Sequence, residues 1–312
     1  MAAITTAQQA STSSLKRFII RHPVAAFLGM VYGISWLLFL PSFLSQNGIG
    51  VLPFEIPVTP FVLLSVVFGI TLPAYIVTRV TGGREGVREL RRRYTHWRVG
   101  IGWYLVALFV LPIADLLGAS LWLGTGPLEA FAGRWELLFT VFLKDALVNA
   151  IVINLLEEGG WAGFLLPRLQ ERWGALRSSA MVAAAMGLFH TPLIFIVTGV
   201  SDTRIPPDRY WFYVFMLFVA IIPVRVLVTW LWNSTRGSVI IVALLHGAFN
   251  TTTGQEFLPE FVPGDPLWVY GVYAVLALIV IALTRGRLAY RGDPAPRPVA
   301  AHHPNEESLS RA

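Results

Sequence analysis

Long apolar stretches separated by short polar segments dominate the chain, and each is close to the length of a membrane-spanning helix. A helix needs about 20 apolar residues to cross the hydrocarbon core of a bilayer. We therefore predict an all-α fold, a polytopic membrane bundle of about eight transmembrane helices that together form a transmembrane domain over residues 23–284. The predicted spans lie near residues 23–44, 59–80, 101–123, 137–166, 178–200, 210–232, 238–254 and 267–284.

The positively charged side chains give this bundle an orientation. If both termini are cytoplasmic, the inner segments hold 19 of the 24 Lys and Arg residues, the outer loops hold three, and two lie inside spans. Short cytoplasmic loops of membrane proteins carry such an excess of positive charge. The pattern predicts a cytoplasmic N-terminal tail at residues 1–22. It also predicts a cytoplasmic tail at residues 285–312, whose Pro-rich, polar composition is typical of disorder.

Composition agrees with a membrane protein. The chain is 55% hydrophobic and 13% charged, whereas a soluble domain has about 25% charged residues. The net charge of +6 follows from the inner arginines, so it indicates contact with an anionic lipid bilayer and no nucleic acid. The absence of cysteine excludes disulfides, thiolate metal sites and a cysteine nucleophile. No removable signal peptide is expected at the polar N-terminus. The arginine-rich, lysine-poor chain without cysteine indicates a bacterial protein, and with the apolar spans we expect a multi-pass protein of the plasma membrane.

Ionisable and amide side chains stand out inside three of the predicted spans. Glu157 and Glu158 are adjacent in the fourth span, and His190 lies in the fifth. His246 and Asn250 lie one helical turn apart in the seventh. At 1.5 Å per residue, all three helices bring their polar groups to similar heights, ~12 to ~18 Å above the inner membrane interface. The spans therefore predict one polar site in the inner half of the bilayer.

Packing alone explains some of these residues. A single histidine or asparagine in a membrane helix is often a hydrogen-bonding contact between helices. Gly159 and Gly163, four residues apart, predict a close-packing face for a neighbouring helix. Two adjacent carboxylates are different, because burying them costs several kcal/mol unless charge, proton or water compensates. We therefore interpret the group as functional rather than architectural.

Three short motifs connect this group to a known family. They are EEGGWAGFLLPRLQ starting at Glu157, MGLFHTP starting at Met186 and HGAFN starting at His246. In this order on separate helices, they resemble the EExxxR, FxxxH and HxxxN motifs of the CPBP family of intramembrane proteases. That family includes CAAX prenyl proteases, abortive-infection proteins and lysostaphin-resistance-A-like proteins. The resemblance covers about residues 137–254 and implies endopeptidase activity on a membrane-associated peptide or protein, by CAAX-type or leader-type processing.

Two positions depart from the family pattern. Met186 stands in place of the phenylalanine, which keeps an apolar side chain. Ala162 stands in place of the arginine, so Glu158 lacks the cation that would lie one turn away. Arg225 in the sixth span lies at nearly the same depth, ~10 Å against ~12 Å for Glu158. We predict that Arg225 pairs with Glu158; the alternative is that Glu158 is protonated.

The resemblance implies a water-activating mechanism. Adjacent helical residues point about 100° apart, so Glu157 is expected to face the cavity and take a proton from water, while Glu158 braces the site. His190 would position that water, and His246 with Asn250 would donate hydrogen bonds to the developing oxyanion. The predicted catalytic residues are Glu157, Glu158, His190, His246 and Asn250, supported by Arg225, Gly159 and Gly163.

Other interpretations stay open at this point. Glu157, His190 and His246 are also a plausible zinc set, which would make the enzyme a metalloprotease; the sequence does not decide, although it lacks the HExxH spacing of common zinc proteases. The missing arginine at Ala162 also allows a catalytically degenerate scaffold or regulator of another enzyme. A transporter or channel would need polar residues through the whole bilayer. Asp115 is a further deep acid with no assigned role.

Overall fold

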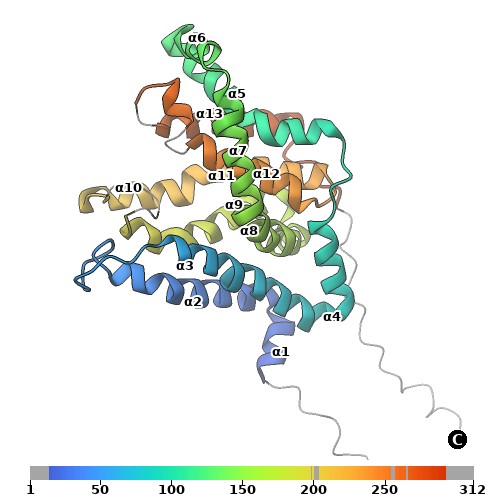
Figure 1. Ribbon diagram of the computed structural model, residues 1–312. Helices are drawn as coiled ribbons and strands as arrows, with labels where there is room; N and C mark the ends of the chain where they lie inside the picture. The colour runs from blue at the N-terminus through green and yellow to red at the C-terminus, as the bar shows by residue number, and fades with distance from the viewer. Residues whose placement is uncertain (1–13, 198, 200–203, 254–256, 265, 293–312) are drawn as a thin grey trace, which may run out of the picture.

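Figure 1 shows a bundle of helices in the computed structural model, which describes residues 14–197, 199, 204–253, 257–264 and 266–292. No β-strand occurs among these residues, so the predicted all-α fold is confirmed. The first half of the chain contains α1 (Ser14–Arg21), α2 (Pro23–Leu44), α3 (Thr59–Leu64), η1 (Ser65–Thr71), α4 (Leu72–Tyr94), α5 (Ile101–Leu123) and α6 (Gly126–Gly133). The middle contains η2 (Leu138–Leu143), α7 (Lys144–Asn149), η3 (Ala150–Asn154), α8 (Leu155–Gly160), η4 (Trp161–Leu165), α9 (Leu166–His190) and η5 (Thr191–Phe195). The last part contains η6 (Pro207–Arg209), α10 (Tyr210–Phe215), η7 (Met216–Ala220), α11 (Ile221–Ser234), α12 (Val239–Thr253), η8 (Leu258–Glu260), η9 (Pro266–Trp268) and α13 (Val269–Leu283).

The helical segments match the predicted spans closely. Within the described part of the chain, five segments are long and apolar enough to cross a membrane, and two shorter apolar helices, α12 and α13, accompany them. One segment runs over 58 residues and contains two predicted spans, because the backbone leaves helical geometry at Gly174 (φ 70°, ψ 173°) between them. The five long segments are Pro23–Leu44, Thr59–Tyr94, Ile101–Leu123, Leu138–Phe195 and Pro207–Ser234.

Two boundaries differ from the prediction. The fifth span was expected to reach residue 200, but α9 ends at His190 and a 3₁₀ turn follows. Pro192 explains this end, because proline lacks the backbone donor and disfavours α-helical geometry in the residue before it. The second span was expected to end near residue 80, yet helix continues to Tyr94 past a break at Gly83 (φ 63°). A glycine can adopt this positive φ without strain, so the chain turns there and resumes as helix.

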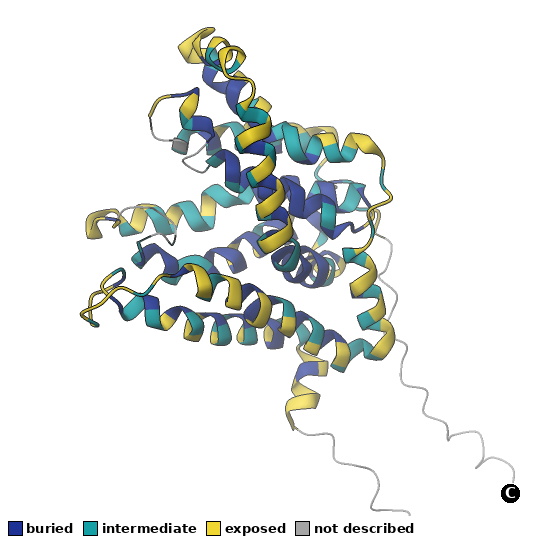
Figure 2. Ribbon diagram, viewed as in Figure 1, coloured by how far each residue is buried: buried dark blue, intermediate teal, exposed yellow. Residues whose placement is uncertain are grey.

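The centre of the bundle is α12, which packs against α5, α7, α8 and α11. Figure 2 shows the buried residues gathered in the middle of the molecule, whereas α7 and the turns beside it present exposed residues on the side that faces the viewer. Gly247 lets α12 approach the helical segment that precedes α8. A Cβ at this position would lie 2.3 Å from the Ala146 carbonyl oxygen and 3.0 Å from the Ala150 nitrogen.

The outer surface is strongly apolar. Leu121, Trp211 and Leu283 are 88%, 81% and 80% exposed, and many other large apolar side chains accompany them. Soluble monomers rarely expose apolar surface so extensively. Together with the apolar helices, this surface indicates a multi-pass membrane protein.

The two predicted tails are partly folded. Residues 14–21 form α1, in which Ile19 is buried. Disorder was expected from residue 285, yet Leu288 is fully buried against α9, α11 and α13, and the Asn233 amide donates a hydrogen bond to its carbonyl oxygen (3.0 Å). The polar composition of this segment predicted disorder, but burial of the single apolar side chain of Leu288 holds residues 285–292 on the bundle. Residues 1–13 and 293–312 lie outside the described residues.

Candidate active site

The two adjacent glutamates lie on α8, a short stretch between two π-helical turns. The turns are η3 before α8 and η4 after it, and both Glu157 and Glu158 are buried. Each π-helical turn inserts a residue into the helix and changes the direction of the side chains that follow, a feature common at functional sites. The sequence contained no simple signal for these turns, because every residue in them is compatible with ordinary α-helix.

Glycine after the glutamates lets α4 come close. A Cβ on Gly159 would lie 1.5 Å from the Tyr94 hydroxyl oxygen, so no larger side chain fits there unless Tyr94 moves. Gly163 is less demanding, since its nearest atom, Leu90 Cδ1, would lie 3.4 Å from the added Cβ. The close-packing face predicted from these glycines is therefore confirmed at Gly159, whereas Gly163 makes an ordinary contact.

Glu158 is paired with Arg225. The guanidinium donates two hydrogen bonds, from Nη1 to Oε1 (2.5 Å) and from Nη2 to Oε2 (3.2 Å). Both side chains are buried, 2% and 0% exposed. The predicted pairing across α8 and α11 is confirmed, and it provides the cation that is missing at Ala162. Because both carboxylate oxygens accept hydrogen bonds, the geometry is that of an ionised Glu158 rather than the protonated alternative.

His246 joins the same cluster from α12. Its Nδ1 lies 2.9 Å from Glu158 Oε1, and because a carboxylate only accepts, Nδ1 is the donor. This bond fixes the ring and directs Nε2 away from Glu158. The sequence predicted that His246 and the glutamates share one site, which requires α8 and α12 to be neighbours. The hydrogen bond between His246 and Glu158 confirms that they are.

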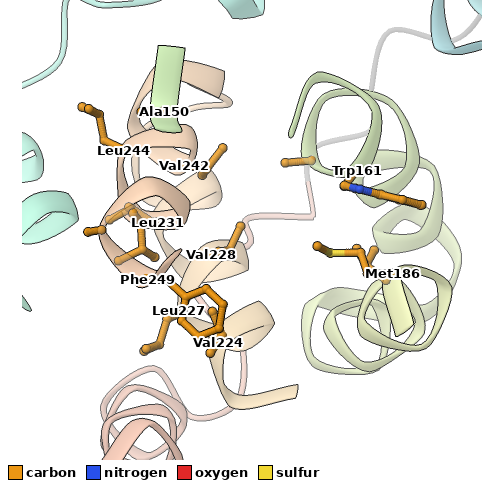
Figure 3. Close-up of a cluster of buried hydrophobic side chains, with 14 of the residues drawn as sticks. Ala150, Trp161, Met186, Val224, Leu227, Val228, Leu231, Val242, Leu244 and Phe249 are labelled. Atoms are coloured by element: carbon orange, nitrogen blue, oxygen red, sulfur yellow. The ribbon is translucent and has the colours of Figure 1, made fainter. Parts of the chain in front are cut away.

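Glu157 has a different environment from its neighbour. The Trp161 indole donates a hydrogen bond from Nε1 to Glu157 Oε1 (3.1 Å), and both residues are buried. The second carboxylate oxygen has no such bond in the described part of the chain. The role of Trp161 was not predicted, although its position four residues after Glu157 would have allowed it. Figure 3 shows Trp161 and Met186 beside one another, across from Val228 and Val242.

His190 ends α9 and is oriented by its own helix. Its Nδ1 lies 2.8 Å from the Met186 carbonyl oxygen, so Nδ1 is again the donor and Nε2 is left for another partner. The Phe189 ring packs edge-on against both His190 and Trp161, which brings the end of α9 to the glutamate-bearing helix. Met186 itself is 4% exposed and belongs to the apolar core, as predicted for its replacement of phenylalanine.

Two asparagines complete the surroundings. Asn250 is half-buried on α12, one turn beyond His246, and no hydrogen bond ties it to the glutamates or histidines among the described residues. Asn154 was missed by the sequence analysis. It is fully buried, and neither its Oδ1 nor its Nδ2 has a hydrogen-bond partner among the residues that the structure describes. It lies one turn before Glu158, on the same helix face.

Metal ligation can be tested against this geometry. Both imidazoles donate through Nδ1 and present Nε2, which is the arrangement of a metal-bound histidine. However, no three His, Asp or Glu side chains of the described residues converge closely enough to hold a metal ion. Glu157, His190 and His246 do not form such a group in this arrangement, so the zinc set stays a prediction.

Asp115, the other deep acid, makes no hydrogen bond or ion pair with this cluster among the described residues. It is fully buried on α5 and accepts a hydrogen bond from the Tyr273 hydroxyl of α13 (2.8 Å). Its second oxygen, Oδ1, has no partner in the described part of the chain. This hydrogen bond links α5 to α13, neither of which carries a glutamate or histidine of the cluster. Asp115 therefore has a role in helix packing.

Known proteins match the segment that contains this site. Residues 138–252 match the family model described as Type II CAAX prenyl endopeptidase Rce1-like. A CAAX prenyl protease 2 from Methanococcus maripaludis is 27% identical over 154 residues, which cover 49% of this chain and 55% of that relative. The match thus spans about half the length of the relative. The family resemblance that the three motifs indicated is confirmed over the segment that contains all of them.

Proposed function

We propose that this protein is an intramembrane endopeptidase that hydrolyses a peptide bond in a membrane-associated protein or peptide, with CAAX-type processing as its reaction. The family match and the relative's name support this substrate class. One observation carries the assignment of roles. Both oxygens of Glu158 are occupied by Arg225 and His246, whereas Glu157 is bonded only through Oε1 within the described part of the chain. Glu157 is therefore the carboxylate that can act on water.

In the proposed reaction, the free oxygen of Glu157 takes a proton from a water molecule. The water oxygen forms a bond to the scissile carbonyl carbon, and the carbonyl oxygen becomes an oxyanion. When this intermediate collapses, the C–N bond breaks and protonated Glu157 returns the proton to the leaving amine. The products are a new carboxyl terminus and a new amino terminus. Glu158 stays ionised throughout and holds Arg225 and His246 in place.

The histidines have complementary roles in this proposal. With Nδ1 bonded to the Met186 carbonyl, neutral His190 has a lone pair on Nε2 that can orient the attacking water. His246 donates Nδ1–H to Glu158, so its Nε2 donates to the oxyanion only when the ring is protonated. Asn250 carries an amide donor that needs no proton. We therefore assign Asn250 to oxyanion stabilisation in either state of His246.

The pairing of Arg225 with Glu158 favours an active enzyme over a degenerate scaffold. Ala162 removed the family arginine, and a scaffold would have had no need to replace it. In this chain a guanidinium from α11 binds the same carboxylate in bidentate geometry. Bidentate pairs of this kind give geometric specificity as well as binding energy. The replacement keeps Glu158 charged and oriented, which is what the proposed mechanism needs.

The test compares wild type with Glu157→Gln and with Glu55→Gln, an exposed acid far from the site in sequence. Each purified protein is incubated with prenylated CAAX and membrane-leader peptides, with and without a zinc chelator, and products are identified by mass spectrometry. We expect wild type and Glu55→Gln to cleave a CAAX peptide, and Glu157→Gln to lose at least 100-fold in rate.

Cleavage that survives in Glu157→Gln would refute the assigned base. Chelator-sensitive cleavage would assign the reaction to a metal. No cleavage by any protein would favour the scaffold.

A further inference from the structure

A polar cavity lies outside the candidate active site. Its volume is about 510 Å³, within the range of small-molecule sites. It is lined by the last turns of α4, the start of α9, the end of α11 and the segment that follows α13. None of Glu157, His190 and His246 lines it. The cavity is therefore a separate site, on the side of the bundle where the arginines gather.

One arginine of the cavity wall, Arg93, already has partners within the protein. Arg93 lies with Nε 3.6 Å from Glu89 Oε1, and its Nη1 donates to the Gly163 carbonyl oxygen at 2.5 Å. Its guanidinium also lies over the Trp232 ring, 5.6 Å from the centroid. Arg93 is therefore a fixed part of the cavity wall, joined to η4 just after the glutamates.

The rim carries positive charge that the protein does not balance. Arg236 and Arg291 both line the cavity and are exposed. Neither forms an ion pair with any residue that the structure describes. Glu171, the remaining acid in the lining, acts electrostatically on Arg93. The two rim arginines thus face the cavity with their charges available to an anionic ligand.

The cavity is preformed by a network of amides. Gln170 on α9 and Asn233 on α11 exchange hydrogen bonds of 3.2 and 2.8 Å between their carboxamides. Asn233 also donates to the Leu288 carbonyl oxygen at 3.0 Å, which holds the segment after α13 against these helices. Arg291 follows three residues later. Its position on the rim is therefore set by a buried anchor, and little ordering remains to be done when a ligand binds.

We propose that this cavity binds the anionic headgroup of a phospholipid, with its phosphodiester on Arg236 and Arg291. Basic pockets between transmembrane helices on the cytoplasmic side are typical headgroup sites. Trp232 and Tyr290 in the lining are the aromatic residues that favour the headgroup level of a bilayer. A peptide carboxylate fits the same charges less well, because no residue of the candidate active site lines the cavity.

The test uses the full-length chain in a neutral detergent, titrated with equimolar phosphatidylglycerol and phosphatidylcholine and observed by native mass spectrometry. Wild type should retain one phosphatidylglycerol in preference to phosphatidylcholine. The double variant Arg236→Gln/Arg291→Gln should bind phosphatidylglycerol about 30-fold more weakly, the effect of two arginines near a headgroup. The matched control, Arg285→Gln/Arg287→Gln, removes the same charge from exposed positions in the segment that carries Arg291, and neither position lines the cavity. It should bind like wild type.

Several results would overturn the proposal. Equal retention of the two lipids by wild type would show that no anionic headgroup is selected. Equal losses in both double variants would assign the effect to overall surface charge. Displacement of phosphatidylglycerol by a peptide with a free carboxyl terminus, but not by its amide, would assign the cavity to a peptide. Displacement by inorganic phosphate at equal concentration would show that the lipid part is not recognised. Unchanged thermal unfolding of the variants confirms that they fold.

Discussion

The guanidinium of Arg225 and the carboxylate of Glu158 form a bidentate ion pair between α11 and α8, closed off from solvent on both sides. In the family motif the cation follows the glutamates on the same helix. Here Ala162 occupies that position, and the cation comes from α11, where Arg225 follows Glu158 by 67 residues. The pair therefore joins two helices of the bundle as well as orienting the carboxylate.

Removing one partner of this pair should be costly. Arg225→Met leaves Glu158 buried without its cation, which we expect to lower the free energy of unfolding by ~3–5 kcal/mol. The double variant Glu158→Leu/Arg225→Met leaves no unpaired charge and should lose less stability than Arg225→Met alone. Thermal unfolding in detergent measures both. With the single variant Glu158→Leu measured as well, a loss in the double variant equal to the sum of the two single losses would show that the pair contributes no coupling.

The two glycines after the glutamates should respond differently to the same substitution. Gly159→Ala places a methyl group on Tyr94, so we expect a loss of ~1–3 kcal/mol from overpacking. Gly163→Ala meets its nearest atom at 3.4 Å and should be tolerated. Adding Tyr94→Leu should recover stability in Gly159→Ala. The midpoints of thermal unfolding provide the comparison, and equal effects at the two glycines would contradict the packing described for α4 and α8.

Asn154 should show opposite effects on stability and turnover. Its carboxamide is buried without a partner, and each unsatisfied group costs ~1–3 kcal/mol. We expect Asn154→Leu to match or exceed wild type in unfolding temperature. Because the free carboxamide lies one turn from Glu158, we expect it to form one hydrogen bond with the bound peptide, and its loss should lower kcat about tenfold. Asn149→Leu, one π-turn earlier on the same segment, is the control and should keep its turnover. A destabilised Asn154→Leu with normal kcat would mean that Asn154 serves packing only.

The fold was largely predictable from the sequence because apolar length determines a membrane span. Pro23–Leu44 and Ile101–Leu123 begin and end at the predicted residues. The misses occurred where a single residue decided the outcome. Pro192 ended α9 early, and Leu288 anchored a segment whose polar composition indicated disorder. Averages over a window of residues do not detect such single contacts.

The site was predictable only in part. The rise per residue along each helix was enough to predict that Arg225 and Glu158 lie at a similar depth, and the ion pair between them confirms it. Rotation about the helix axis was not predictable, because the π-helical turns on both sides of α8 change it. For this reason the unpaired Asn154 was found only in the structure. The bond from Trp161 to Glu157 follows the i, i+4 spacing and could have been predicted from the sequence.

The relocated arginine should be movable back to its position in the family motif. Ala162 lies one turn after Glu158 and is fully buried, so an arginine there competes for space with Arg225. We expect Ala162→Arg alone to be destabilising, because it adds a second buried cation to a satisfied carboxylate. In the Arg225→Ala background, the arginine introduced at position 162 can occupy the volume that the Arg225 side chain vacated. It can also pair with Glu158, which has lost its cation. The double variant Ala162→Arg/Arg225→Ala should therefore be more stable than either single variant and recover part of the peptide cleavage lost in Arg225→Ala. Unfolding temperature and turnover are measured on all four proteins. If the double variant is no better than Arg225→Ala, the cation must come from α11, and the two positions are not equivalent ways of holding Glu158.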